Sequence, residues 1–252
     1  HFLKTFPFNV SQIGVSYNLL YVDYDSEDGF SDRLVTEIEY KKDIFSKHLQ
    51  QIRMVKLINP ARYDIRRAKN LGAFYASKYS NILAISDADT MLGMHYLKKW
   101  TSLIHEGNTF VTNRSQDNRS RYPKRLSPEV NYGNIVVSTK DFLRVGGYDE
   151  KNIGWGGDDD DLFHRLKNMG LREINPHSVD DALQYSIMHE DDLRFKDTEF
   201  PEMIRPSKKE TELAFEKIYS NNKIQSEKSD YIDDKFVKII SKEIILYDKK
   251  RT

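Results

Sequence analysis

Short apolar runs alternate along this chain with segments in which apolar residues recur every three or four positions. The runs have the length of strands and cover residues 17–22, 52–58, 82–85, 109–112 and 133–138. The segments with helical spacing cover residues 1–10, 32–50, 64–77, 96–105 and 158–169. This spacing separates strands from amphipathic helices. Strands that alternate with helices predict an α/β fold with a mostly parallel central sheet.

Two acidic loops follow predicted strands. The first reads YVDYDSEDG and begins at Tyr21, and the second reads SDADT and begins at Ser86. Ligands of open α/β sheets bind at the carboxyl ends of the strands, so both loops are expected to face one crevice. The first loop is also compatible with a plain turn, because Asp, Ser and Gly all favour turns.

The second loop contains the pattern Asp-x-Asp at Asp87 and Asp89. Two carboxylates this close can hold Mg²⁺ or Mn²⁺, which keep contacts to substrate phosphates. An ordinary acidic turn is the alternative for this short pattern alone. His189, in SIMHEDD, could add a nitrogen ligand suited to Mn²⁺, although a single histidine is more often structural.

The run GWGGDDDDL, from Gly154 to Leu162, carries the clearest chemistry. It offers a flexible loop, an aromatic ring able to stack on a sugar, and four carboxylates in the first turn of a predicted helix. A carboxylate there can accept a proton from an attacking hydroxyl. The alternative is a surface helix whose acidic first turn complements the helix dipole.

Basic residues gather in two places. Arg66, Arg67 and Lys69 lie on the predicted helix 64–77, and Arg114–Arg125 lie in a polar segment between two strands. Either group can be a solvated surface. The first could instead neutralise a diphosphate, and the second could form a lid over an anionic donor.

Composition narrows the classes of function. The 252 residues include 39 basic and 39 acidic side chains, so no net positive charge calls for nucleic acid. There is no cysteine, which excludes disulfides and thiolate metal sites and suits a reducing cytoplasm. No apolar run approaches the roughly 20 residues that span a bilayer, and no signal peptide is visible. Because the first residue is His1, we expect the natural start to be missing.

Together these motifs resemble the GT-A glycosyltransferases, specifically inverting family 2 and the β-1,4-galactosyltransferase-like group. The resemblance extends from about His1 to about Asp192, and the family's first strand would precede it. The run from Val145 to Gly170 is similar to the galactosyltransferase signature, with Asp158 where that signature has Glu. The matching positions elsewhere are Asp23, Ser26 and Asp28 in the acidic loop, Ala68, Lys69, Asn70 and Gly72 in the helix (with Lys69 replacing Arg), and the pair Asp87 and Asp89.

The resemblance implies a role for each of these residues. Asp159 would be the catalytic base, and Trp155, Gly156, Gly157 and Asp158 would bind the sugar substrates. Asp23, Ser26, Asp28, Lys69, Asn70 and Asp87 would bind the nucleotide. The metal, Mn²⁺ or Mg²⁺, would be held by Asp89 and His189 with help from Asp87, and Ser186 stands where the family has a methionine ligand.

The expected enzyme is thus an inverting, metal-dependent hexosyltransferase. It would move galactose or N-acetylgalactosamine from a UDP-sugar to a glycan or lipid-linked saccharide acceptor. Analogy favours bacterial surface-polysaccharide synthesis, in the cytoplasm, with peripheral association at the inner face of the membrane. The alternatives are a glycoside hydrolase with paired carboxylates, a nucleotidyltransferase and a non-catalytic carbohydrate-binding module.

We expect the domain organisation to follow the motifs. Residues 1–204 would form the glycosyltransferase domain, with a nucleotide-binding half at 1–112 and an acceptor and catalytic half at 113–204. Residues 205–252, in which Lys and Glu alternate, are predicted to form a charged helical appendage.

Overall fold

The computed structural model describes residues 2–24, 26, 28–58, 64–112, 126–127, 133–151, 157–175, 184–187 and 241–249. The helices in these ranges are α1 (Phe2–Asn9), α2 (Phe30–Tyr40), the short 3-10 helix η1 (Lys42–Ile44), α3 (Ile65–Ala76), α4 (Tyr96–Thr101), α5 (Thr139–Arg144) and α6 (Asp158–Asn168). The strands are β1 (Tyr17–Asp23), β2 (Leu49–Leu57), β3 (Ile82–Ile85), β4 (Thr90–Leu92), β5 (Thr109–Thr112), β6 (Leu126–Ser127), β7 (Ile135–Ser138), β8 (Arg172–Ile174), β9 (Gln184–Ile187) and β10 (Ser241–Asp248).

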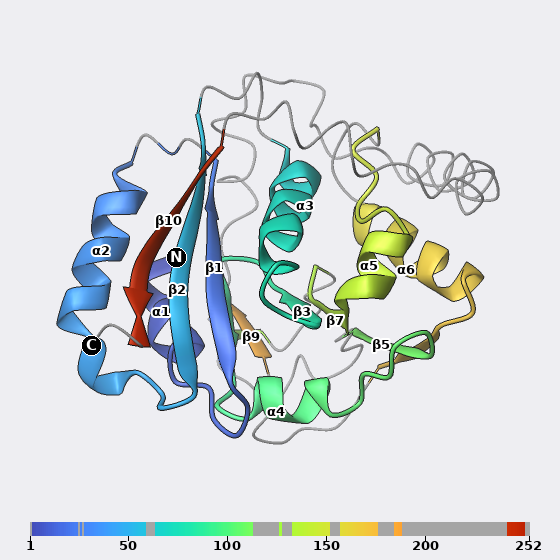
Figure 1. Cartoon of the computed structure of the whole chain (residues 1–252), viewed down its shortest axis with the longest axis horizontal. Coiled ribbons are helices and arrows are strands. Elements are labelled where there is room, and N and C mark those ends of the chain that lie inside the picture. Colours follow the sequence, from blue (N-terminus) through green and yellow to red (C-terminus); the bar gives the residue numbers. More distant parts are fainter. Residues whose placement is uncertain are drawn as a thin grey trace.

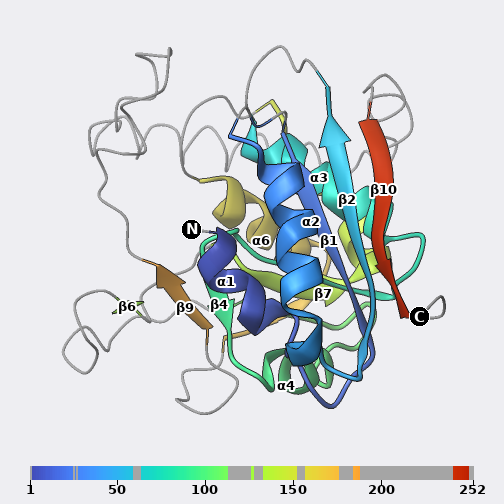
Figure 2. The same cartoon turned by 90° about the vertical axis from the view of Figure 1, so that its left-hand side faces the viewer.

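The first sheet has the order β1-β2-β10, with α1 and α2 on one face and α3 on the other (Figures 1 and 2). The central strand β2 is buried on both faces. Ile52 and Met54 pack into the cluster that includes α1 and α2, whereas Val55 and Leu57 pack against Leu71 of α3. Successive side chains of a strand point to opposite faces, so this alternation places a helix layer on each side.

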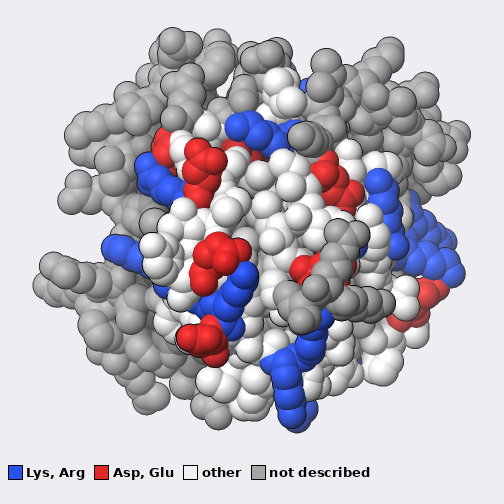
Figure 3. Space-filling view, turned by 60° about the vertical axis from the view of Figure 1, so that its left-hand side comes forward, with Lys and Arg blue, Asp and Glu red and all other residues white. Residues whose placement is uncertain are grey.

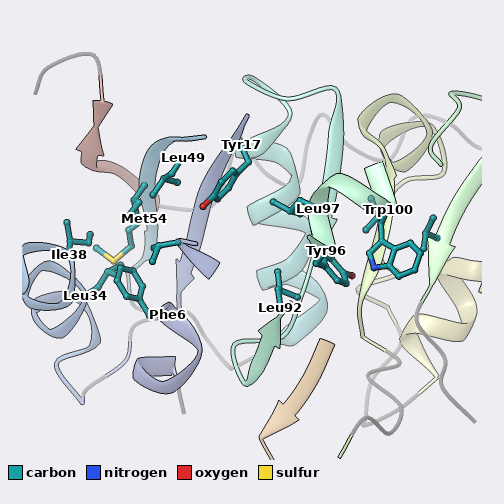
Figure 4. Close-up of a cluster of buried hydrophobic side chains, with 14 residues drawn as sticks. Phe6, Tyr17, Leu34, Ile38, Leu49, Met54, Leu92, Tyr96, Leu97 and Trp100 are labelled. Atoms are coloured by element: carbon teal, nitrogen blue, oxygen red, sulfur yellow. The ribbon is translucent and has the colours of Figure 1, made fainter. Parts of the chain in front are cut away.

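The largest hydrophobic cluster joins the first sheet to the region around α4 (Figure 4). At the end of the cluster next to the first sheet lie Phe6 of α1 and Leu34 of α2, and at its far end lies Trp100 of α4. These three side chains are at most 2% exposed. Burial of large apolar side chains of this kind contributes roughly 1.5–3 kcal/mol each, so this cluster fixes α4 and the loop before it relative to β1.

A second sheet has the order β3-β7-β5-β8, and α5 and α6 pack beside it (Figure 1). Phe110 of β5 and Phe163 of α6 are both fully buried, with ring centroids 5.9 Å apart. A small third sheet, β4-β9-β6, follows the end of β3. Because α6 packs against the sheet that contains β3, the end of β3 and the start of α6 lie in the same part of the molecule.

The α/β class is confirmed, but the mostly parallel order predicted for the sheet is wrong for the described strands. Only β1 with β2 and β5 with β8 run parallel there. The other pairings are antiparallel, because β7 runs opposite to β3 and β5, β9 runs opposite to β4 and β6, and β10 runs opposite to β2. Hydrophobic spacing records a strand's length and burial but not its direction, and this is why the sequence pattern misled.

The helical appendage predicted for residues 205–252 is also wrong where the structure describes it. Residues 241–248 form β10, which pairs along the edge of β2. Ile244 and Leu246 pack against the core, while Ile245 between them is 47% exposed. That period of two is typical of a strand, but the flanking Lys and Glu residues concealed it. Residues 205–240 lie outside the described ranges.

Two predicted helices are shorter than expected. The segment 32–50 contains α2 and η1 but then turns into β2 at Leu49, and the segment 96–105 is helical only as far as Thr101. Within the described residues, none of the helices is long and apolar enough to cross a membrane. Acidic and basic side chains alternate over the face seen in Figure 3, in keeping with the balanced composition.

Candidate active site

Lys69, on α3, is the centre of the candidate site. Asp64 begins α3 by accepting a hydrogen bond from the backbone N–H of Arg66 at 3.0 Å, as an N-cap residue does. One turn further on, the Lys69 side chain is only 8% exposed, and its Nζ lies 3.3 Å from Asp87 Oδ1 and 3.4 Å from Asp159 Oδ1. The structure thus brings together three residues that the sequence placed in separate motifs.

Asp87 follows β3 in a turn that several other elements hold. Its backbone N–H donates to Asn134 Oδ1 at 3.1 Å, and Asn134 Nδ2 donates to Gln184 Oε1 of β9 at 2.7 Å. Thr5 of α1 donates its hydroxyl to the carbonyl of Ala88 at 2.8 Å, between the two acidic residues of the Asp-x-Asp pattern. The turn is therefore fixed by α1, β9 and the segment before β7.

Gly133 makes room for the pairing of Lys69 with Asp87. A Cβ atom at position 133 would lie 2.4 Å from Asp87 Oδ2 and 2.9 Å from Lys69 Nζ. The carbonyl oxygen of Gly133 is itself 3.4 Å from Lys69 Nζ and accepts a hydrogen bond from it. No side chain larger than glycine fits there without displacing these charged groups.

Asp159 is held by the way in which α6 begins and is anchored. Gly157 precedes α6 with a φ of 77°, a left-handed conformation that glycine adopts at little cost. One turn into the helix, Asp161 pairs with Arg165 through contacts of 2.5 and 2.8 Å, and Arg165 Nη1 also donates to the carbonyl of Val145 at 2.8 Å. Of the four consecutive Asp residues, Asp161 is therefore structural, and Asp159 is the one that reaches Lys69.

The site perturbs the ionisation of Asp159 and Lys69. Burial raises the pKa of Asp159 to about 7, with Asp158 and Asp87 adding to the rise and Lys69 opposing it. Burial alone would lower the pKa of Lys69, but Tyr148, Asp87 and Asp159 outweigh it and raise that pKa well above its ordinary value. At neutral pH the ammonium is therefore charged, while Asp159 lies close to its midpoint, as suits a general base.

Asn70 holds the segment before α6 rather than facing the Lys69 cluster. It is 4% exposed, its Nδ2 donates to the carbonyl of Tyr148 at 2.8 Å, and its Oδ1 accepts the Tyr148 backbone N–H at 2.8 Å. Its Nδ2 also donates to Glu150 Oε1 at 3.0 Å. A Cβ atom on Gly147, whose φ is +65°, would lie 2.4 Å from Asn70 Oδ1. In this structure the polar atoms of Asn70 bind the protein itself and so position this segment. The assignment of Asn70 to nucleotide binding stays a prediction.

The acidic loop after β1 forms a separate cluster. The side chain of Asp23 is 0% exposed, accepts hydrogen bonds from the Ser26 backbone N–H and the Ser31 hydroxyl at 2.9 Å each, and lies 3.7 Å from Lys56 Nζ. Asp28 accepts the backbone N–H of Phe30 at 3.0 Å at the start of α2. These bonds shape the loop. The assignment of Asp23, Ser26 and Asp28 to nucleotide binding stays a prediction.

The predicted metal ligands fall only partly within the described residues. Asp87 and Asp89 lie on one turn, and β9, whose Ser186 pairs with Thr90, ends two residues before His189. His189 itself lies outside the described ranges, as do Trp155, Gly156 and the loop Arg114–Arg125. Among the described residues there is no group of three His, Asp or Glu side chains that could hold a metal. Asp87 Oδ1 does fit a metal, since it is buried without a hydrogen-bond partner.

Three contributors to the site were missed by the sequence reasoning. Tyr148 lies under Lys69, with its ring centroid 5.1 Å from Nζ, and Gly133 and Asn134 shape the surroundings of Asp87. Gly133 and Asn134 immediately precede β7, and Tyr148 stands in VGGYDE just before the acidic run. These glycine-containing strand and helix ends were the available signal, because close backbone approach needs glycine.

One comparison with known proteins concerns the segment that carries Asp159. Residues 115–191 match the family model described as the N-terminal domain of galactosyltransferase. This segment is galactosyltransferase-like. The resemblance stated from the motifs is confirmed at that level, for a segment shorter than half of the chain.

Individual relatives agree over still shorter stretches. A stretch of 54 residues is 39% identical to beta-1,4-galactosyltransferase 1 of Mus musculus, and it covers 21% of this chain and 14% of that protein. Another of 59 residues is 34% identical to beta-1,4-galactosyltransferase 5 of Danio rerio, covering 23% of this chain and 16% of that protein. The matches therefore span a small part of these relatives.

Two solved structures are similar over most of the chain. One is the catalytic domain of Drosophila beta1,4galactosyltransferase 7 in complex with xylobiose, with a TM-score of 0.47 and 16% identity over 80% of each chain. The other is a mutant of the Drosophila enzyme in complex with manganese, UDP-Gal and xylobiose, with a TM-score of 0.47 and 18% identity over 78% of this chain and 79% of that one.

Proposed function

We propose that this protein is an inverting, metal-dependent GT-A glycosyltransferase. It transfers galactose or N-acetylgalactosamine from a UDP-sugar to a hydroxyl of a glycan acceptor. The observation that carries the proposal is the contact of Lys69 with both Asp87 and Asp159, which unites the Asp-x-Asp turn with the acidic start of α6. The galactosyltransferase-like segment 115–191 contains Asp159 and supports the choice of sugar.

Asp159 acts as the general base. Its carboxylate takes the proton of the acceptor hydroxyl while that oxygen attacks the anomeric carbon from the face opposite the nucleotide. The new carbon–oxygen bond forms as the bond from the anomeric carbon to the diphosphate breaks, and UDP leaves with the bonding electron pair. A pKa of about 7 leaves a substantial ionised fraction at neutral pH and still gives useful basicity.

Asp87, Asp89 and His189 would hold the metal ion, Mn²⁺ or Mg²⁺. When bound, the ion would neutralise charge that develops on the departing diphosphate. The buried Asp87 Oδ1 without a hydrogen-bond partner and the carboxylate-rich donor set fit such an ion. Because Ser186 of β9 pairs with Thr90, the strand leads the chain toward the Asp-x-Asp turn, which supports His189 as a third ligand.

The remaining assignments complete the proposal. Asp23, Ser26 and Asp28 would contact the nucleotide, and Trp155 with Gly156, Gly157 and Asp158 would contact the sugars. Closure of the loop Arg114–Arg125 would exclude water that could hydrolyse the donor. A lipid-linked saccharide of bacterial surface-polysaccharide synthesis would serve as acceptor, at the inner face of the membrane.

The test is release of UDP from a panel of UDP-sugars, with and without Mn²⁺, followed by the anomeric configuration of the product. We expect one donor to be consumed only with metal, and the product to be inverted at the anomeric carbon. A retained configuration would refute the role of Asp159 as base. Sugar release from a glycan without any nucleotide would instead indicate a hydrolase, and glycan binding unaffected by Asp159→Asn would indicate a binding module.

A further inference from the structure

The ammonium of Lys69 is shared among several acceptors without a short contact to any of them. Its Nζ lies 3.3 Å from Asp87 Oδ1, 3.4 Å from Asp159 Oδ1 and 3.4 Å from the carbonyl oxygen of Gly133. Charge-assisted hydrogen bonds of this type are usually about 2.7–2.9 Å long. Lys69 therefore bridges two carboxylates, with a long hydrogen bond to Asp159 and an ion pair without a hydrogen bond to Asp87.

The buried ammonium of Lys69 is the shared ionic partner of two carboxylates, those of Asp87 and Asp159. The side chains of Lys69, Asp87 and Asp159 are 8%, 29% and 16% exposed. The neighbouring cation on α3, Arg66, is already paired with Asp64 through its Nε at 3.0 Å. Buried charges require partners, so Lys69 holds the two carboxylates together against their mutual repulsion.

The atom of Asp87 that faces Lys69 is also the one that a divalent cation would use. Asp87 Oδ1 makes no hydrogen bond and has the ammonium as its ionic partner. A cation bound to this oxygen would repel the ammonium 3.3 Å away. Lysine has a flexible stem with a point charge, so its head group can move toward Asp159 without a change in the helix.

We propose that Lys69 is a positioning residue that occupies the Asp87 end of the metal site until a divalent cation displaces it, and that it then pairs with Asp159 alone. Metal binding would in this way fix the orientation of the base. The inference rests on the proposed function in one respect, the use of Asp87 as a metal ligand.

Binding of Mn²⁺ alone, without nucleotide, tests this competition. The free Mn²⁺ signal in electron paramagnetic resonance is followed as the ion is titrated with the full chain. Lys69→Gln should bind Mn²⁺ about tenfold more tightly than the wild type, because the competing charge is gone while a hydrogen-bond donor remains. Lys69→Arg, which keeps the charge, should stay within about twofold of the wild type. Lys140→Met is the control, because Lys140 of α5 is exposed and pairs with the exposed Glu106 rather than with a residue of the candidate site.

Turnover provides the second readout. Lys69→Gln should transfer sugar at least about tenfold more slowly in spite of its tighter metal binding, because Asp159 has lost its ionic partner. A merely structural role would weaken metal binding and turnover together. Mn²⁺ affinity that is unchanged or lower in Lys69→Gln would overturn the inference.

A measurement on the wild-type protein covers the case in which Lys69→Gln does not fold. The ¹⁵Nζ resonance of Lys69, assigned by its loss in Lys69→Arg, should shift as diamagnetic Mg²⁺ is added and saturate when the site is full. A resonance that does not move at saturation would show that Lys69 keeps its partners. Neither binding experiment uses a sugar nucleotide, so failure to turn over any UDP-sugar would refute the proposed function separately.

Discussion

The clamp that Asn70 forms on Tyr148 can be tested by Asn70→Ala. The substitution removes the donor to the Tyr148 carbonyl at 2.8 Å, the acceptor for the Tyr148 N–H at 2.8 Å and the donor to Glu150 at 3.0 Å. Both backbone groups belong to a residue that is 1% exposed. A buried polar group left without a partner destabilises by about 1–3 kcal/mol, so we expect a loss of about 3 kcal/mol in the free energy of unfolding.

Urea unfolding followed by circular dichroism measures that loss, and a thermal scan should show a fall in Tm of roughly 6–12 °C for a chain of this size. Asn168→Ala is a matched control at an exposed position of α6 and should stay within about 0.5 kcal/mol of the wild type. If Asn70→Ala were as stable as Asn168→Ala, the clamp would not hold the segment before α6, and our account of how Asp159 is positioned would fail.

Three further predictions concern the groups around Asp159. In the metal-free protein, ¹³C NMR of the Asp159 carboxyl carbon should show a titration midpoint near pH 7, and a midpoint near 4 would contradict the burial argument. Lys69→Met should raise that midpoint, because Lys69 lowers the pKa of Asp159. Gly133→Ala should reduce transfer at least about tenfold, since its Cβ would displace Asp87 and Lys69. Gly107→Ala has open space around it and a φ of +74°, so it strains the backbone and should lower stability alone; equal turnover in the two variants would refute the steric argument. Arg165→Met leaves Asp161 buried without its partner and should lower the free energy of unfolding by about 3–5 kcal/mol in urea, and a loss below about 1 kcal/mol would show that this pair does not anchor α6.

The sequence predicted the bounds of a helix best where hydrophobic spacing coincided with residues that favour helix ends. The helix α3 was expected at residues 64–77 from its apolar spacing and is found at Ile65–Ala76, where Asp64, the first residue of the expected range, caps it. The start of α6 was expected at Asp158 and is found there, and Gly170 after it has the positive φ of 92° that ends many helices. Local chemistry determines such features, so local sequence reveals them.

Features that depend on distant parts of the chain were harder to predict. The direction of β7 and the pairing of β10 with β2 arise from tertiary contacts that hydrophobic spacing does not record. In the site, the residue types of Lys69, Asp87 and Asp159 could be read from their motifs, whereas their meeting at one point could not. Tyr148 and Gly133 were missed because their roles follow from proximity in space.

The most direct test of the central claim compares Asp159→Asn with the wild type in both UDP-sugar binding and sugar transfer. The account predicts that the variant binds the UDP-sugar with near-normal affinity by calorimetry in the presence of Mn²⁺, while transfer falls by at least about a hundredfold through loss of the base. Transfer at the wild-type rate would contradict the assignment of Asp159 as the catalytic base and, with it, the account of how this site works.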